Sequence, residues 1–446
     1  MMKIITFTRL SLVERSALTD LTLWKDPADT LTTAQWKAFF KNLSQCLNLT
    51  SLHLSLTGFT EDNLVHLSQA LSHCTKLNTV TIKNNELHEF TPVTWACLSQ
   101  LFEQLANFQS LDISFNSLTL LTELQWASLK EMVTKCSNLR VLNISMAALD
   151  RLTEVEWFNL NQIFNVCQKL KALNISINHL ASFNAIAWAG LSQLFMHCTH
   201  LSALNLAFID LNKFTEAQWP SFVQAMHHCR QLNVLNISGN ALHQFTLPQW
   251  TALSQALGQC RQLSSLSLAY NALNQFKEPQ WAGFDLLVSQ YTKLRALNLT
   301  NNQLHKIAVK RLGPLQAKLS QFTTLTLSAQ EVNSMSFGQL DAWALIAPNA
   351  VFIAVNAAGA SLDSDKLRYL QLKVGRGPIV ANACLLYHLI GQPVLHSSVG
   401  NPIFRLGARL PRETVLEIAS FLSHGFLIDR GIRALCRAEE ARTLRA

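Results

Sequence analysis

The sequence has few of the features that mark catalytic or nucleic-acid-binding chains. Only 15 glycines are spread over 446 residues, and no glycine-rich phosphate-binding loop is present. Of the net charge of +8, residues 363–446 carry +5, and no dense basic run interleaved with aromatics occurs. Because phosphate backbones need clustered cations, we expect no nucleic-acid partner. No Ser/His/Asp set or pair of carboxylates can be placed, so we expect no enzymatic activity and no cofactor.

The chain also lacks recognisable targeting and membrane-spanning segments. Its N-terminus, MMKIITFTRLSLVERSAL, has no apolar core of about 7–15 residues such as a signal peptide carries. The most apolar window, residues 342–362, contains Pro348, Asn349 and Asn356 and keeps the repeat spacing, so we do not expect it to span a membrane. These absences predict a soluble protein that does not use the general secretory route.

The ten cysteines form no CxxC pair or Cys/His cluster, and we therefore expect no metal site. Seven of them occupy one slot of a repeated pattern: Cys46, Cys74, Cys136, Cys167, Cys198, Cys229 and Cys260. The last five are 31 residues apart. Cysteines at one repeated slot indicate small buried apolar groups rather than a disulfide framework.

What the sequence has in abundance is a repeat of 31 residues. Tryptophan recurs at this spacing: Trp95, Trp126, Trp157, Trp188, Trp219, Trp250 and Trp281. Trp36 belongs to the same series, with Leu64 filling the slot between Trp36 and Trp95. A second phrase, LxxLxLxxN, keeps the same period, as in LNISGNAL at 235 and LNLTNNQL at 297. A fixed period of this size is typical of a solenoid.

Each repeat predicts a short strand followed by a helix. Leu235 and Ile237 alternate as in a strand, and Asn240 suits a turn because its side chain can bond neighbouring backbone groups. Apolar residues at i, i+3, i+7 and i+10 from Trp250 form one helical face. The equivalent strand positions predict twelve strands, at Leu21, Leu52, Val80, Leu111, Leu142, Leu173, Leu204, Leu235, Leu266, Leu297, Leu325 and Ile353.

The recurring phrase FTEAQW, residues 214–219, explains the tryptophans. Thr215 and Gln218 fit a capping box, in which each side chain satisfies a backbone N–H at the helix start. Phe214 and Trp219 then form a hydrophobic staple that fixes the angle at which the chain enters the helix. We expect the tryptophans to be core residues. Pro220 directly follows Trp219, and the pattern offers no reason for it.

The phrase LxxLxLxxN resembles the leucine-rich repeat, in particular the ribonuclease-inhibitor-like class with a helix in each repeat. The resemblance implies a curved α/β solenoid of about twelve repeats. A parallel β-sheet would line the concave face, helices the convex face, and the asparagines would form a ladder. We expect an N-terminal cap at residues 1–16, the solenoid at 17–362 and a small helical C-terminal domain at 363–446. We also expect a monomer.

The concave face offers two rows of side chains. The middle strand position is mostly polar: Asp112, Asn143, Asn174, Asn205, Asn236, Ser267 and Asn298. The position before the ladder asparagine is mostly apolar: Phe115, Met146, Ile177, Phe208, Gly239 and Tyr270. Because exposed apolar rows mark partner surfaces, we predict that a partner protein binds here, contacting the apolar row and Asn143, Asn174, Asn205 and Asn236. The alternative is that the apolar side chains pack against one another.

The C-terminal segment contains an apolar run at 379–390 that looks helical, then LPRETVLEIASFL at 410–422 and ALCRAEEARTL at 434–444. Residues 409–444 resemble an F-box, with matches at Leu410, Pro411, Ile418 and Leu422. The resemblance implies that these four residues bind the Skp-type adaptor of a cullin ubiquitin ligase. The alternative is a helical cap on the end of the solenoid.

The chain as a whole resembles leucine-rich-repeat effectors of Legionella-type intracellular bacteria. That resemblance implies secretion by a type IV system into the host cell cytosol; Leu444, behind Glu439 and Glu440, suits the loose C-terminal signal. Two functions follow. The protein either presents a host protein to a ubiquitin ligase, or it is a binding scaffold or inhibitor whose C-terminal helices serve only as a cap.

Overall fold

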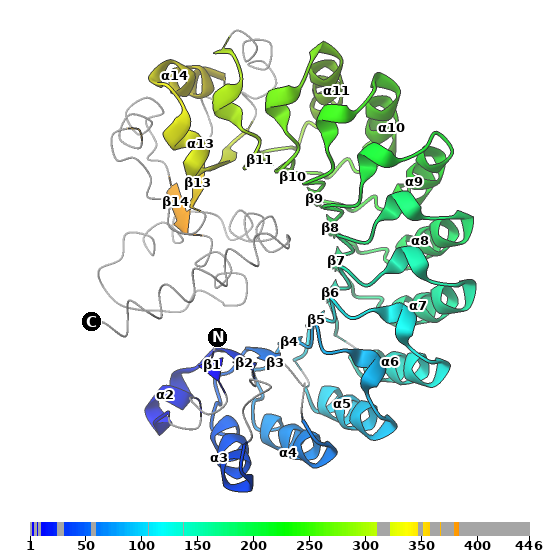
Figure 1. Ribbon diagram of the computed structural model, residues 1–446, viewed down its shortest axis with the longest axis vertical. Helices are drawn as coiled ribbons and strands as arrows, with labels where there is room; N and C mark the ends of the chain where they lie inside the picture. Colours follow the sequence, from blue (N-terminus) through cyan, green and yellow to red (C-terminus); the bar gives the residue numbers. More distant parts are fainter. Residues whose placement is uncertain are drawn as a thin grey trace. The chain divides into compact units, whose positions relative to one another are not determined.

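Between residues 79 and 289 each repeat folds as a short β-strand, a one-turn 3-10 helix and an α-helix (Figure 1). The computed structural model describes residues 2–3, 7, 10–24, 31–54, 59–105, 107–136, 138–309, 322–346, 351–356, 366 and 379–382. The chain divides into unit 1, Met1–Leu201, and unit 2, Ser202–Ala446.

Unit 1 is a parallel sheet with its helices on one side (Figure 1). Its strands follow chain order: β1 Met2–Lys3, β2 Asp20–Trp24, β3 Ser51–Leu54, β4 Thr79–Thr81, β5 Ser110–Asp112, β6 Val141–Asn143 and β7 Ala172–Asn174. The α-helices are α2 Leu12–Ala17, α3 Thr33–Leu43, α4 Glu61–Leu71, α5 Pro92–Gln104, α6 Glu123–Lys135, α7 Glu154–Val166 and α8 Ala185–His197. The 3-10 helices are η1 Leu87–Glu89, η2 Leu118–Leu120, η3 Leu149–Arg151 and η4 Leu180–Ser182.

Unit 2 repeats the same plan. Its strands are β8 Ala203–Asn205, β9 Val234–Asn236, β10 Ser265–Ser267, β11 Ala296–Asn298, β12 Thr324–Ser328, β13 Val351–Asn356 and β14 Ile379–Asn382, again parallel and in chain order. The α-helices are α9 Gln218–Met226, α10 Leu247–Leu257, α11 Glu278–Ser289, α13 Ala329–Ser334 and α14 Phe337–Ile346. The 3-10 helices are η5 Leu211–Lys213, η6 Leu242–Gln244, η7 Leu273–Gln275 and η8 Leu304–Lys306.

The twelve predicted strands correspond to β2 through β13, with two corrections near the C-terminus. Leu325 pairs with Phe352, so the predicted equivalence of Ile353 is wrong by one residue. The run VFIAV is apolar throughout, and without alternation a sequence pattern cannot set the register. The first four residues of the run predicted as helical, Ile379–Asn382, form strand β14 beside β13. The remainder of that run lies outside the described residues, and the domain boundary at 362 stays a prediction.

The core has the composition that the repeat predicts. Strand residues such as Leu111 and Leu235 are fully buried. Within the described part of the chain, the cysteines are buried and free of disulfides, which confirms their prediction as small apolar groups. Burial raises the pKa of Cys74, Cys167, Cys198 and Cys260 to about 12, so these thiols stay protonated at neutral pH.

The predicted tryptophan staple is confirmed. The ring centroids of Phe214 and Trp219 are 5.3 Å apart, and those of Phe245 and Trp250 are also 5.3 Å apart. Several tryptophans reach the next repeat as well: the Trp219 and Phe245 centroids are 5.9 Å apart in an edge-to-face arrangement, as are those of Trp250 and Phe276. The aromatic rings therefore form a continuous line, Phe214, Trp219, Phe245, Trp250, Phe276 and Trp281, along unit 2.

The helix starts also follow the prediction, with one exception that Pro220 explains. Capping boxes form at Thr32/Gln35, Thr122/Gln125, Thr153/Glu156 and Thr246/Gln249. In α9 the helix begins only at Gln218, although the Thr215 amide still donates to Gln218 Oε1 at 2.9 Å. Proline has no N–H to donate to the carbonyl four residues earlier, that of Glu216, so the first turn cannot close as in the other repeats.

The capping glutamines also bond to the preceding repeat, which the sequence pattern did not predict. Gln125 Nε2 donates to the carbonyl of His88 at 2.7 Å, and Gln280 Nε2 donates to that of Phe245 at 2.8 Å. Each of these bonds ties a helix start to the 3-10 turn of the preceding repeat. Glutamate cannot donate such a bond, which accounts for the frequent glutamine at this position.

Buried asparagines link successive turns in a hydrogen-bond ladder. Asn240 Nδ2 donates to the carbonyl of Leu206 at 2.9 Å, and its Oδ1 accepts from the amides of Ile209 and Leu211 at 3.1 and 3.2 Å. The ladder has gaps in the sequence, where Ala147 and Ile209 occupy the asparagine slot.

A first prediction concerns the contact between tryptophan and the next helix. A Cβ added to Gly190 would lie 2.5 Å from the Trp157 ring. We expect Gly190→Ala to destabilise the protein by about 1–3 kcal/mol through overpacking, although alanine is the better helix former. Urea unfolding measures the loss.

The matched control is Gly338→Ala in α14, because nothing lies within 4 Å of the added Cβ. This variant should be as stable as the parent chain or slightly more stable. Equal stability of the Gly190→Ala variant and the parent would contradict the tryptophan contact.

A second prediction concerns the ladder. Asn240→Ala leaves the amides of Ile209 and Leu211 without their acceptor, so we expect a loss of about 2–4 kcal/mol in unfolding free energy. Asn212→Ala removes only an exposed side-chain bond to Gln244 and should cost about 0.5 kcal/mol or less. Similar losses in the two variants, measured by urea unfolding, would show that the ladder bonds contribute little.

Candidate functional site

The candidate site lies on the inner face, the side of each sheet opposite its α-helices. Leu111 and Ile113 point into the core, so the alternation of a strand turns Asp112 and Ser114 to the inner face. We call the middle strand positions the polar row and the residues before the ladder position the turn row. In unit 1 the turn row is Phe115, Met146 and Ile177, and in unit 2 it is Phe208, Gly239 and Tyr270.

The polar row is largely buried and bonded to its own backbone. Asn174, Asn205 and Asn236 are only 3–4% exposed. The Oδ1 atom of each accepts the N–H of the residue two positions on at 3.0 Å, and half-buried Asn143 does the same for Ser145. Each of these asparagines is the last residue of its strand, and its side chain bonds the backbone that leaves the strand. Their predicted contact with a partner stays a prediction, and the surface that the three buried ones offer is small.

Asp112 puts a carboxyl group in the slot that holds asparagine in most repeats. Its Oδ1 accepts the Ser114 amide at 2.9 Å. Burial raises the pKa of Asp112, and the charge of Lys83 and hydrogen bonds from Ser114 and Asn143 oppose this effect only in part. The carboxylate is therefore less stable in the folded chain than in the unfolded one.

The turn row has an unusual backbone. Phe115, Met146 and Ile177 have φ of +59°, +52° and +57°, in the left-handed region. Side chains other than glycine or asparagine cost about 1–2 kcal/mol there, and a β-branched residue such as Ile177 is a genuine outlier. The backbone is held in place because the amides of Phe115 and Met146 each donate to a carbonyl of the next repeat at 3.0 Å.

In unit 1 the turn row includes an exposed apolar side chain. Met146 is 43% exposed, while Phe115 and Ile177 are half-buried. The Nζ atom of Lys83 lies 5.9 Å from the centroid of the Phe115 ring, which is within the range of a cation–π contact. This part of the row combines apolar and cationic character.

In unit 2 the turn row packs on itself. The Phe208 and Tyr270 rings lie 6.1 Å apart, centroid to centroid, and Gly239 stands between them in the repeat order. A Cβ on Gly239 would lie 2.2 Å from the Phe208 ring, so phenylalanine covers the space that a side chain would fill. Side chains of the row therefore pack on one another in unit 2, whereas in unit 1 the row includes an exposed residue.

Sequence reasoning missed one buried carboxylate. Glu331 is 4% exposed and accepts from the amides of Asn301 and Leu304 at 3.1 and 3.3 Å. It thus takes the place of the ladder asparagine in the repeat that follows Asn302. The available signal was the capping box that Glu331 forms with Ser328 at the start of α13.

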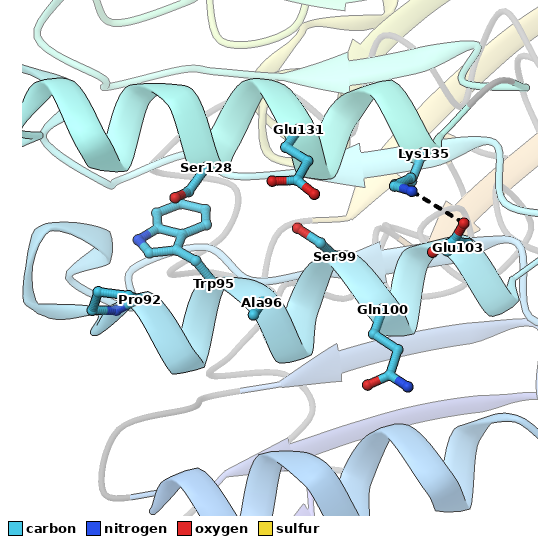
Figure 2. A pocket seen from close by; sticks show the side chains of 9 residues that line it. All are labelled: Pro92, Trp95, Ala96, Ser99, Gln100, Glu103, Ser128, Glu131 and Lys135. Atoms are coloured by element: carbon cyan, nitrogen blue, oxygen red, sulfur yellow. Dashed lines mark hydrogen bonds and ion pairs between the residues drawn. The ribbon is translucent and has the colours of Figure 1, made fainter.

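A groove of about 220 Å³ lies on the helix side of unit 1, between α5 and α6 (Figure 2). Ser128 lies over the Trp95 ring there. It occupies the same position in its repeat as Gly190, which lies against Trp157 two repeats later. Lys135 Nζ and Glu103 Oε1 are 3.1 Å apart at one end. The groove is lined by Pro92, Trp95, Ala96, Ser99, Gln100, Glu103, Ser128, Glu131 and Lys135, and these residues include no nucleophile paired with a base.

Other predicted features can be placed only in part. Among the described residues, no group of three or more His, Cys, Asp or Glu could hold a metal ion. No helix within the described ranges has the length and hydropathy that crossing a membrane requires. The F-box-like residues Leu410, Pro411, Ile418 and Leu422 lie outside the described residues.

A third prediction concerns Asp112. Because its pKa is raised on folding, the folded chain binds the proton more tightly, and stability is lost as pH rises through and above the unfolded value of about 3.9. We expect Asp112→Asn to be more stable than the parent at pH 7, with the difference shrinking towards pH 4. Urea unfolding across this range measures it.

The exposed carboxylate of Glu86 supplies the control, Glu86→Gln. A difference for Asp112→Asn that grows towards acid pH would contradict the stated direction of the pKa shift.

The fold can be compared with solved structures. The chain is similar to the leucine-rich repeat-containing protein LegL7 from Legionella pneumophila, with 21% identity and a TM-score of 0.58. The match covers 74% of this chain and 99% of that one. No family model and no curated protein matches the sequence. Together with the parallel strands and the asparagine ladder, this likeness shows that the chain has the predicted leucine-rich-repeat solenoid fold.

Proposed function

We propose that this chain is a non-catalytic binding scaffold that holds a partner protein on its inner face. The observation that carries the proposal is the turn row of unit 1. Phe115, Met146 and Ile177 occupy left-handed backbone positions, and Met146 is 43% exposed. Strain of this kind persists where the surrounding structure enforces it, and it clusters at functional sites.

The backbone does not require bulky residues at these positions. Gly239 occupies the same slot with φ of +67°, and Asn84 and Asn301 occupy it with φ of +54° and +59°. Glycine or asparagine would therefore relieve the strain at Phe115, Met146 and Ile177. Contacts within the chain, such as that of Lys83 with Phe115, offset part of the cost at the half-buried positions, and at exposed Met146 we assign this role to a partner protein.

We further propose that the partner is a host protein. The sequence resembles leucine-rich-repeat effectors of Legionella-type bacteria, and the fold resembles that of a Legionella pneumophila protein. Both support delivery of the chain by a type IV system into the host cell cytosol. There the inner face would meet a host target.

The segment 409–444 supports a finer version of this proposal. Its resemblance to an F-box suggests that Leu410, Pro411, Ile418 and Leu422 bind the Skp-type adaptor, so that the bound host protein reaches a cullin ubiquitin ligase. The competing version is a scaffold or inhibitor in which these residues only cap the solenoid.

A fourth prediction tests the inner face. The full chain is expressed in host cells with a photo-crosslinking amino acid in place of Met146. It should capture one protein that is not captured when the same amino acid replaces Leu286. Leu286 in α11 is 44% exposed, which matches the 43% of Met146. The purified target should bind Met146→Lys at least about tenfold more weakly, roughly 1.4 kcal/mol, by calorimetry.

The Leu286→Lys variant should bind the target as the parent chain does. Equal capture at the two positions, or an unchanged Kd for Met146→Lys, would remove the inner face of unit 1 as the binding site.

The adaptor version has its own test. Purified chain and Skp-type adaptor are titrated, beside a Leu410→Ala/Pro411→Ala variant with an unchanged circular dichroism spectrum. Saturable binding that the variant loses would support ligase presentation. No binding at about 30 μM, roughly −6 kcal/mol, would leave the scaffold or inhibitor version.

A further inference from the structure

A second apolar row lies on unit 1, at the starts of its helices. The second residue of each of α5, α6, α7 and α8 is large, apolar and exposed: Val93 45%, Leu124 78%, Val155 56% and Ile186 42%. We call these four residues the helix-start row. Because α5 through α8 pack side by side in chain order, the row crosses four neighbouring helices (Figure 1).

Two more exposed side chains extend the helix-start row. Phe158, 60% exposed, lies three residues after Val155 and therefore on the same face of α7. Leu120, 54% exposed, ends the 3-10 turn that leads into α6. The most exposed part of the patch thus centres on α6 and α7.

The helix starts do not need these residues. Capping in α6 and α7 is complete with Thr122/Gln125 and Thr153/Glu156, and the staple uses the tryptophan. In unit 2 the equivalent positions are Ala217, Pro248 and Pro279. This position of the repeat therefore accepts a small residue or a proline. Large exposed apolar groups in successive repeats of unit 1 instead indicate a contact surface.

The charges around the row select one kind of partner. The four segments 87–96, 118–127, 149–158 and 180–189 contain five acidic residues, against Arg151 as the one Lys or Arg. Glu123 and Glu154 are exposed and directly precede Leu124 and Val155. An apolar patch with this charge attracts a segment that is apolar and basic. It repels a second copy of itself and an anionic membrane surface.

The spacing of the row matches that of an α-helix laid across it. Packed helices lie about 8–10 Å apart. Residues seven apart in an α-helix are about 10.5 Å apart along its axis. A crossing helix can therefore place one apolar residue of its seam on each of α5 to α8. We propose that the helix-start row binds a basic amphipathic helix of a partner protein, as a site separate from the inner face.

The test uses the full chain and a labelled synthetic helix of about 22 residues, long enough to cross four packed helices. Leucines form one face of the peptide and lysines the other. Fluorescence anisotropy should show saturable binding that weakens as salt rises from about 0.05 to 0.5 M. A peptide with glutamate in place of lysine should bind at least tenfold more weakly, and so should one whose leucines are scrambled off a single face.

Variants then locate the site. Leu124→Ser/Phe158→Ser should weaken binding of the lysine peptide at least tenfold. Leu345→Ser, 62% exposed in α14, should leave it unchanged. Met146→Lys on the inner face should also leave it unchanged, so this test can fail or succeed independently of the inner-face proposal. Unaltered melting curves confirm that the variants are folded.

Several outcomes would overturn the proposal. These are no saturable binding, equal binding by Leu124→Ser/Phe158→Ser, and equal binding of the glutamate or scrambled peptide. A dimer in sedimentation velocity that Leu124→Ser/Phe158→Ser dissociates would assign the row to a second copy. Binding to phosphatidylserine-containing vesicles, lost in the same variant, would assign it to a membrane surface.

Discussion

The contact between each tryptophan and the helix of the following repeat is the interaction on which the rest depends. In unit 2 the Trp250 ring packs against Phe245 of its own repeat, Phe276 of the next, and the Cα of Gly283. In the repeats that carry the tryptophan, this contact sets the angle between neighbouring helices and their separation. Helices set in this way bring the strands to one register, and the turns then come close enough for an asparagine to bridge them.

The asparagine ladder in turn determines where the side chains of the turn row lie. An asparagine of the next repeat accepts the amide of the ladder-position residue, Ala147 and Ile209 included, and the residue before that position is in the left-handed region whichever side chain it carries. The backbone therefore fixes the direction of the side chain at this position, while its type differs from repeat to repeat. In unit 1 the position carries Met146, which is exposed, and in unit 2 it carries Phe208, which covers Gly239. The same rigid repeat presents the helix-start row on a different surface, where capping side chains hold the first turn.

Much of the fold was predictable because the residues that make each interaction recur in many repeats. The staple, the capping boxes and the cysteine slot follow from period and spacing alone. The register of Phe352 and the strand at Ile379–Asn382 did not follow, since their apolar runs lack alternation. The burial of Asn174 depends on neighbouring repeats, which a single-repeat pattern does not contain. The helix-start row was readable in the sequence at Leu124 and Val155, but only solvent exposure separates such residues from core.

Methionine oxidation tests the central claim, partner binding on the inner face of unit 1, most directly. In the free chain, exposed Met146 and Met196, at 43% and 49%, should oxidise with dilute peroxide, whereas buried Met132 and Met226 should not. With the target protein bound, mass spectrometry should find Met146 protected and Met196, on α8, oxidised as before. Equal oxidation of Met146 with and without the saturating target would contradict binding at this face.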